Sequence, residues 1–255
     1  MMKDFTHRRP CSLDAQPVDT HLFWQQCQRH YTFQPIYRVT GRLVAIELLT
    51  AVTHPSAPQT RVSPEDYFAA LTVPQRLDII KEQLVQLAQW QDHFIHDDLV
   101  ASVNIDGPTL LAIRHEAEIR ALIARLPCVR FELVEHYALP QEEIVAQMPE
   151  LNALWLDDFG SGMANFSALT ELKYDVIKLS RELFLLLRKS EEGRNLFAML
   201  LALINRYCNG VIVEGVETAE EWAMVRNSPA FAAQGYYFSR PLSFEHLKDL
   251  PRQLA

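Results

Sequence analysis

The chain has 255 residues, of which 49% are hydrophobic and 22% are charged, and its formal net charge is −8. This is enough apolar material for one large buried core or two small ones. The negative balance argues against non-specific binding to the backbone of DNA or RNA, although an acidic protein can still bind a small anion through metal ions.

The ends of the chain and its cysteines predict a soluble cytoplasmic protein. Residues 1–20 are polar and lack the apolar segment of a signal peptide, so we expect a loose tail there and a single domain over residues 21–255. The most apolar stretch, residues 196–204, is too short to span a bilayer. The four cysteines form no CxxC pair, which favours a reducing compartment and no zinc site.

The first third of the chain predicts a helix, a β-hairpin and two more helices. Residues 33–39 and 43–49 are two apolar runs that read as extended strands, and Thr40-Gly41 between them makes a turn. Residues 54–62 contain Pro55 and Pro58 and are predicted to form a loop. We expect the helices over residues 22–29, 64–71 and 74–94.

From residue 99 onward, short apolar strands alternate with amphipathic helices. We expect strands over residues 99–105, 129–134, 153–157, 176–179, 211–213 and 232–238. We expect helices over residues 108–125, 141–148, 165–172, 181–188, 194–208 and 219–226. This alternation predicts a parallel sheet buried on both faces, and with the hairpin there are enough strands to close a TIM-like (β/α)8 barrel. A doubly wound open sheet is the alternative, which the lack of a GxGxxG after a strand disfavours.

Polar residues stand at the carboxyl end of every predicted strand after the first, where a barrel carries its chemistry. Trp155-Leu-Asp-Asp-Phe-Gly-Ser-Gly162 runs from a buried strand into two adjacent carboxylates and a loop. The other strands end on Glu47, Asn104, Glu132, Lys178, Glu214 and Gln234, with Glu135 and Glu217 just beyond two of them. Such a ring is not expected in a purely hydrophobic core, because each buried polar group costs free energy unless it is paired.

Each of these residues also has a purely structural interpretation. One of the two aspartates could cap the following helix, Glu47 could face solvent on an edge hairpin, and Asn104 could satisfy loop backbone. Glu135 could only brace its loop. Lys178 lies between apolar neighbours, which favours a paired or functional role for it. His93 and His96 lie among aspartates and indicate a solvated helix end more than a metal pair.

The ring as a whole indicates a site for hard divalent cations. Carboxylates with an asparagine, and no histidine or cysteine, suit magnesium or manganese better than zinc or copper. Several carboxylates around one point can hold two such ions, and the usual reaction of such a pair is phosphoryl transfer by in-line attack of water.

The residues at these strand ends belong to motifs that resemble those of the EAL-domain phosphodiesterases. Glu47-Leu48-Leu49 resembles the family signature, with leucine in place of the central alanine. The remaining motifs follow in order over residues 33–242: Ser102-Val-Asn-Ile105, Glu132-Leu-Val-Glu135, Asp157-Asp-Phe-Gly-Ser-Gly162, Val176-Ile-Lys178, Glu214-Gly-Val-Glu217 and Gln234-Gly-Tyr-Tyr-Phe-Ser-Arg-Pro241.

The resemblance implies a modified TIM (β/α)8 barrel whose first strand is antiparallel. It also implies a metal-dependent phosphodiesterase that hydrolyses cyclic di-GMP to linear pGpG, using two Mg²⁺ or Mn²⁺ ions to activate water. Such a protein needs no DNA or RNA polymer and no membrane as a partner, and it can form a homodimer.

The resemblance also implies a role for each motif residue. Glu47, Asn104, Glu132 and Asp157 would be metal ligands, with Asp158 reaching the second ion. Lys178 would act on the attacking water or the phosphate charge, and Glu214 would be the general base. Gln34 and Gln234, with Glu47 and Asp158, would contact the substrate, while Glu135 and Glu217 would support the site from nearby.

Two departures from the family pattern leave alternatives open. The position four residues after Glu47 usually holds an arginine that grips a substrate phosphate, and here it is Ala51. Residues 162–165 lack the usual tyrosine-serine run, which bears on control coupled to a dimer. A catalytically silent EAL module that binds cyclic di-GMP or a protein is therefore the second hypothesis. A different barrel enzyme with enolate or sugar-phosphate chemistry is the third.

Overall fold

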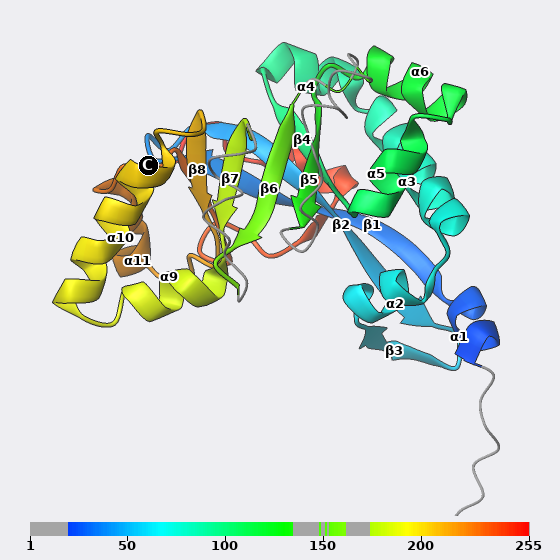
Figure 1. Cartoon of the computed structure of the whole chain (residues 1–255), viewed down its shortest axis with the longest axis horizontal. Coiled ribbons are helices and arrows are strands. Elements are labelled where there is room, and N and C mark those ends of the chain that lie inside the picture. The colour runs from blue at the N-terminus through cyan, green and yellow to red at the C-terminus, as the bar shows by residue number, and fades with distance from the viewer. Residues whose placement is uncertain (1–19, 135–147, 149–150, 152, 162–173, 255) are drawn as a thin grey trace, which may run out of the picture.

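The structure is a computed structural model of the whole chain, and it describes residues 20–134, 148, 151, 153–161 and 174–254 (Figure 1). Within these residues, eight strands close into a barrel, because the first strand pairs with both the second and the last. The barrel strands are β1 (Gln28–Arg38), β2 (Leu43–His54), β4 (Val100–Ile105), β5 (Val129–Val134), β6 (Leu154–Phe159), β7 (Val176–Leu179), β8 (Gly210–Val213) and β9 (Ala232–Gln234).

One strand of the barrel runs against the others. β1 is antiparallel to β2 and to β9, whereas β2 and β4 to β9 are all parallel to one another. The tight turn at Gly41, where φ is +88°, joins β1 to β2 and makes this reversal. The predicted modified TIM barrel with an antiparallel first strand is therefore confirmed.

The helices flank the outside of the barrel (Figure 1). They are α1 (Thr20–Gln26), α2 (Pro64–Ala70), α3 (Val73–Ala88), α4 (Gln91–Asp97), α5 (Gly107–Ile113), α6 (Ala117–Arg125), α9 (Arg181–Leu187), α10 (Glu191–Ile204), α11 (Ala219–Arg226) and the 3₁₀ helix Phe244–Asp249. Several begin at a serine, threonine or aspartate whose side chain accepts a backbone N–H of the first turn. None of the described helices has the length and apolar character that crossing a membrane requires.

Two further strands extend the sheet beyond the barrel. β3 (Ala57–Val62) pairs with the outer part of β2, and β10 (Leu242–Ser243) pairs with β1. The extended hairpin has a small core of its own, in which Val52 packs with Tyr67 and Ile79. Figure 1 shows this extension, with α1 and α2, at one end of the molecule and α9, α10 and α11 at the other.

The interior of the barrel is built in layers. An apolar layer contains Ile36, Ala45, Trp155, Val176, Ile212 and Ala232. Because side chains on a strand alternate between its two faces, the next inward position on each of these strands lies two residues away, toward the same mouth of the barrel. Those six positions are occupied by Gln34, Glu47, Asp157, Lys178, Glu214 and Gln234. The polar ring predicted from the sequence is thus the layer next to this apolar layer, on the side of the barrel mouth.

The structure corrects several predicted boundaries. The predicted helix over residues 22–29 ends at Gln26, because residues 28 onward pair with β2 in an alternating strand. The predicted loop over residues 54–62 contains β3, and the predicted helix over residues 108–125 is divided into α5 and α6. The last barrel strand ends at Gln234, because the chain turns there and the N–H groups of Phe238 and Ser239 donate back to the carbonyl of Gly235. The predicted tail over residues 1–20, apart from its last residue, and the helices predicted over residues 141–148 and 165–172, apart from Met148, lie outside the described residues.

Candidate active site

The centre of the polar layer is the ammonium group of Lys178 on β7, a side chain that is only 1% exposed. Its Nζ atom lies 2.8 Å from Glu132 Oε2 and from Glu214 Oε1, and 3.1 Å from Glu47 Oε2 and from Asp157 Oδ1. Four strands thus deliver carboxylates to one buried cation. This pairing explains how a lysine is tolerated between apolar neighbours.

Glu47 on β2 is also held by amide groups. Asn104 on β4 donates to Glu47 Oε1 at 2.7 Å, and Gln234 on β9 donates to Glu47 Oε2 at 2.7 Å. The same Gln234 amide donates to Gln34 Oε1 at 3.0 Å, and the Gln34 amide donates to the Ser239 carbonyl at 2.9 Å. These bonds fix the orientation of one wall of the site, from β4 round to β9.

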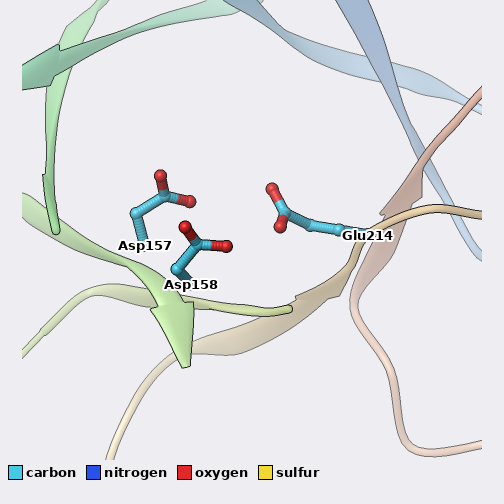
Figure 2. Close-up of side chains that lie close together, drawn as sticks. All are labelled: Asp157, Asp158 and Glu214. Atoms are coloured by element: carbon cyan, nitrogen blue, oxygen red, sulfur yellow. The ribbon is translucent and has the colours of Figure 1, made fainter. Parts of the chain in front are cut away.

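The two adjacent aspartates reach the same side of β6 because the strand is irregular at that point. The pairing of β6 with β7 shifts register between Leu156 and Phe159, and Asp158 adopts a left-handed φ of 54°. Such a backbone costs free energy for a residue other than glycine and is typical of functional sites. One oxygen each of Asp157, Asp158 and Glu214 lies within 4.8 Å of the others, and Figure 2 shows the three carboxylates converging.

Burial and mutual repulsion alter the acidity of these groups. Burial raises the pKa of Glu132 well above its usual value, and the charges of Glu47 and Asp157 add to this. Burial, together with Asp157, raises the pKa of Asp158 to about 6 and that of Glu214 to about 8. Burial would also raise the pKa of Glu47, but Lys178 and the amides of Asn104 and Gln234 outweigh it, so this pKa is lowered.

The surrounding carboxylates also shift the pKa of Lys178. Burial by itself would lower the pKa of the Lys178 ammonium, but Asp157, Glu132, Glu214 and Glu47 outweigh it and raise this pKa well above its usual value. Lys178 is therefore a fixed positive charge, and the protons of this site are exchanged by its carboxyl groups.

The site opens into a cavity of about 380 Å³ at the mouth of the barrel. Glu47, Glu214 and the two glutamines line it, and so do Arg181, Glu217 and Tyr236. The Arg181 guanidinium donates to Glu217 Oε1 at 2.9 Å, so Glu217 stands at the rim in an ion pair and not in the carboxylate cluster around Lys178. Arg181 and Tyr236 were not among the predicted site residues, although each comes shortly after one of them, Lys178 or Gln234.

Ala51 lies on β2, on the same face as Glu47 and directly opposite His30 of β1. Arg38 and Arg42, two of the arginines nearest to it in sequence, are used elsewhere. Arg38 stacks on the ring of Phe231, and Arg42 forms an ion pair with Asp98. Neither of these arginine side chains extends to the mouth of the barrel.

The structure therefore brings most of the predicted site residues together. Glu47, Asn104, Glu132, Asp157, Lys178, Glu214, Gln34 and Gln234 form one connected network, and Asp158 lies beside it. Glu217 is at the rim, and Glu135 lies outside the described residues. Glu214, predicted as a base, also joins the carboxylate group that could hold a cation.

The residues present fit a hard divalent cation. The converging donors are all carboxylate or amide oxygens, which magnesium and manganese prefer. Glu132 Oε1 is buried and accepts no hydrogen bond from any described residue, so the carboxylate that contacts Lys178 keeps one oxygen with ligand capacity. A cation there would also relieve the repulsion that raises the carboxyl pKa values.

Comparisons with known proteins agree with this fold. The family model described as "EAL domain" matches residues 19–241. The chain is 60% identical over 232 residues to the Escherichia coli protein named cyclic di-GMP phosphodiesterase PdeH, a match that covers 91% of both chains.

Two solved structures share the fold at lower identity. The EAL-like domain protein YdiV aligns with a TM-score of 0.78 at 21% identity and covers 89% of this chain and 98% of its own. Klebsiella pneumoniae BlrP1, solved as a manganese and cyclic di-GMP complex, aligns with a TM-score of 0.66 at 23% identity and covers 86% of this chain and 56% of its own.

Proposed function

Since the chain belongs to the EAL-domain family, we propose that it is a metal-dependent phosphodiesterase that hydrolyses cyclic di-GMP to linear pGpG. The observation that carries this proposal is the 60% identity to PdeH over 91% of both chains. The site gives it a chemical basis, because Glu132, Asp157 and Glu214 converge on Lys178 and the Arg181–Glu217 ion pair stands at the rim of the cavity.

Bound Mg²⁺ or Mn²⁺ would supply an activated water and neutralise charge on the phosphodiester. Glu47, Asn104, Glu132, Asp157 and Asp158 are the residues that would hold two such ions, and Glu214 lies close enough to share one of them. BlrP1 was solved with manganese, which supports a divalent cation of this class in this fold.

Lys178 acts on the charge that develops as the phosphodiester is attacked. Its ammonium is buried and held by four carboxylates, so it needs no reorganisation when negative charge grows nearby. The same contacts prevent Lys178 from losing its proton, which leaves proton transfer to another group.

Glu214 is the group best suited to take up and release a proton. Its carboxylate lies 2.8 Å from Lys178 Nζ and lines the cavity, so it can contact a water or a substrate group held there. Contact of this kind is the first requirement for a general base.

The wall formed by Gln34 and Gln234 positions the substrate. The amides are buried and bonded to each other and to Glu47, so they present fixed polar groups to the cavity. Gln234 Oε1 is buried and accepts no hydrogen bond from any described residue, so it is free to accept one from a nucleotide.

The cysteines are scattered along the chain, which is typical of a protein from a reducing compartment. We therefore propose that the enzyme works in the cytoplasm. It acts on the free cyclic nucleotide, without a nucleic-acid polymer.

The test is hydrolysis of cyclic di-GMP by the purified chain, followed by chromatography of the products. We expect pGpG in the presence of Mg²⁺ or Mn²⁺ and no product after exhaustive chelation, with activity restored by adding the metal. Nucleotide binding without turnover would instead support the silent module, and full activity after chelation would rule out the metal mechanism.

A further inference from the structure

The cavity at the mouth of the barrel is lined by several carboxylates and by a single cation. Glu47, Glu214 and Glu217 are its acidic residues, and Arg181 is the one basic side chain among the described residues that line it. A cyclic dinucleotide carries a negative charge on each of its phosphodiester groups. Such a substrate therefore needs a positive group on the wall of this cavity, because the carboxylates alone would repel it.

The cavity extends away from the carboxylates that could hold a cation. Asp157 and Asp158 stand on β6, and Figure 2 shows them facing Glu214, which comes directly after β8. Of these three residues only Glu214 lines the cavity, whose other walls come in part from β1, β2 and β9. A dinucleotide with one phosphate at the three carboxylates would thus place its other half in the cavity, beside Arg181.

The Arg181 side chain is held at the rim along its whole length. Its stem packs against Gly215 so closely that any side chain at position 215 would collide with it. Its guanidinium donates from Nε at 3.3 Å and from a terminal nitrogen at 2.9 Å to one oxygen of Glu217. No other acceptor among the described residues bonds to this guanidinium. Its remaining N–H groups keep the forked geometry that matches the oxygens of a phosphate.

The ion pair between Arg181 and Glu217 can rearrange at low cost. The two side chains are 47% and 40% exposed. Ion pairs in such positions contribute little to stability, because water screens them. The guanidinium can therefore turn toward a phosphate, while Glu217 keeps it close to the cavity when no substrate is bound.

Arg181 stands across the barrel from Ala51. It follows β7, and in the described barrel three strands separate β7 from β2 in either direction. Ala51 lies on β2 and has no side chain that could bind a phosphate. A phosphate contact from the facing wall of the barrel can compensate for this.

We propose that Arg181 binds the phosphate of cyclic di-GMP that is not being cleaved, and so supplies the phosphate contact that Ala51 cannot make. This inference rests on the proposed function, because it takes cyclic di-GMP as the substrate. Arg181 acts on substrate binding and not on the chemical step, since the phosphate that it contacts is remote from the attacking water. It is therefore a specificity-determining residue that sets KM.

The test is the binding and hydrolysis of cyclic di-GMP by Arg181→Met. Calorimetry in Ca²⁺ and steady-state kinetics in Mg²⁺ should show a Kd and a KM about tenfold higher, with kcat unchanged, because one charged hydrogen bond is lost. Arg181→Lys keeps the charge but not the fork, so its Kd should lie between those of wild type and Arg181→Met.

Arg42→Met is the matched control. Arg42 is 49% exposed and pairs with Asp98 at 3.0 Å, so it resembles Arg181 in exposure and pairing, but it stands beside the start of β2, away from the mouth of the barrel. The Kd and KM of this variant should equal those of wild type. Unfolding temperatures equal to wild type verify that each variant is folded.

A double variant distinguishes a direct contact from simple neutralisation of Glu217. If Arg181 only cancelled the charge of Glu217 beside the substrate, Arg181→Met combined with Glu217→Gln would recover the wild-type Kd. A direct contact predicts that the double variant binds as weakly as Arg181→Met.

The outcomes separate this inference from the proposed function. An unchanged Kd for Arg181→Met, recovery of binding in the double variant, or a fall in kcat as large as the rise in Kd would overturn the role of Arg181 and leave the proposed function standing. A wild-type protein that neither binds nor hydrolyses cyclic di-GMP would overturn both.

Discussion

Lys178 is the residue on which the other charges of the site depend. Within the described residues it is the cation that contacts Glu47, Glu132, Asp157 and Glu214, and it is almost completely buried. Without it, four carboxylates would share a small volume with no counter-charge, and each would hold its proton more tightly. One side chain thus stabilises the ring, and under the proposed function it also stands where phosphate charge would develop.

Lys178→Met should lower kcat by about 10²–10³-fold, the usual effect of losing one preorganised group that stabilises the transition state. Binding of cyclic di-GMP, measured by calorimetry in Ca²⁺, should change much less. We expect Ca²⁺ to support binding but not turnover, because its looser geometry places the water poorly. Arg181→Met removes a rim cation and is the contrasting variant, because it should weaken binding and leave kcat unchanged. Equal losses of binding and of kcat would assign Lys178 a structural role instead.

Ala51→Arg should lower KM with little change in kcat. Residue 51 is on the face of β2 that carries Glu47 and is partly exposed, so an arginine there can reach a substrate phosphate. A charged hydrogen bond of this kind contributes about 1.5–3 kcal/mol, or about tenfold to more than a hundredfold in affinity. Steady-state kinetics with cyclic di-GMP provide the measurement.

The control for Ala51→Arg is Thr50→Arg. Thr50 faces the other way and accepts a hydrogen bond from Gln83 on α3 at 3.0 Å, so arginine at position 50 should destabilise the fold without improving KM. Worse values of both KM and kcat for Ala51→Arg would mean that another group already fills that space. Unchanged values would mean that position 51 does not contact the substrate.

Among the secondary-structure elements, side-chain caps connect the strand ends to the helices that follow them. Ser180 comes directly after β7, two residues beyond Lys178, and its hydroxyl caps the start of α9. Thr218 comes directly after Glu217 and caps α11, where the Glu221 side chain in turn accepts the N–H groups of Glu217 and Thr218. The caps therefore hold the loops that carry the site residues.

Thr218→Ala should destabilise the protein by about 1 kcal/mol, because the N–H of Glu221 loses its acceptor at the start of α11. For a domain of this size the unfolding temperature should fall by about 2–4 °C. Thermal unfolding followed by circular dichroism measures the change. Thr218→Ser keeps the hydroxyl and should be close to wild type, and an alanine variant as stable as the serine variant would contradict the role of the cap.

At the scale of the whole molecule, barrel closure concentrates negative charge at one mouth. Seven parallel strands end there, and the antiparallel β1 adds Gln34 to the same layer. Without bound metal, the folded state keeps Asp158 and Glu214 protonated at pH values where the unfolded chain has released those protons. Their contribution to stability is therefore complete below about pH 4 and is lost as the pH rises through about 6 and about 8.

Metal binding should reverse this dependence. Mn²⁺ binds deprotonated carboxylates, so the rise in unfolding temperature that it causes should grow as the pH rises through about 6 and about 8. Calorimetric melts with and without millimolar Mn²⁺ at several pH values test this. Glu214→Gln should flatten the upper part of the increase, and a rise independent of pH would contradict the assigned carboxyl pKa values.

Local patterns in the sequence predict a barrel, with an open sheet as the alternative, and most of the ring. Apolar strands alternating with helices require a parallel sheet covered on both faces, and a polar residue at the end of each strand is conspicuous because a core would exclude it. These are local patterns, and Glu47, Asn104, Glu132, Asp157, Lys178, Glu214 and Gln234 could be identified from them.

Other features of the site depend on tertiary contacts, which no local sequence pattern contains. Lys178 and Glu47 are 131 residues apart in the chain, and only barrel closure brings their side chains to 3.1 Å. The left-handed turn at Asp158, the pairing of Arg181 with Glu217 and the extension of β2 through β3 all depend on neighbouring strands and helices. Burial sets the pKa values in the same way, because a carboxyl group responds to the charges and solvent around it and not to its place in the sequence.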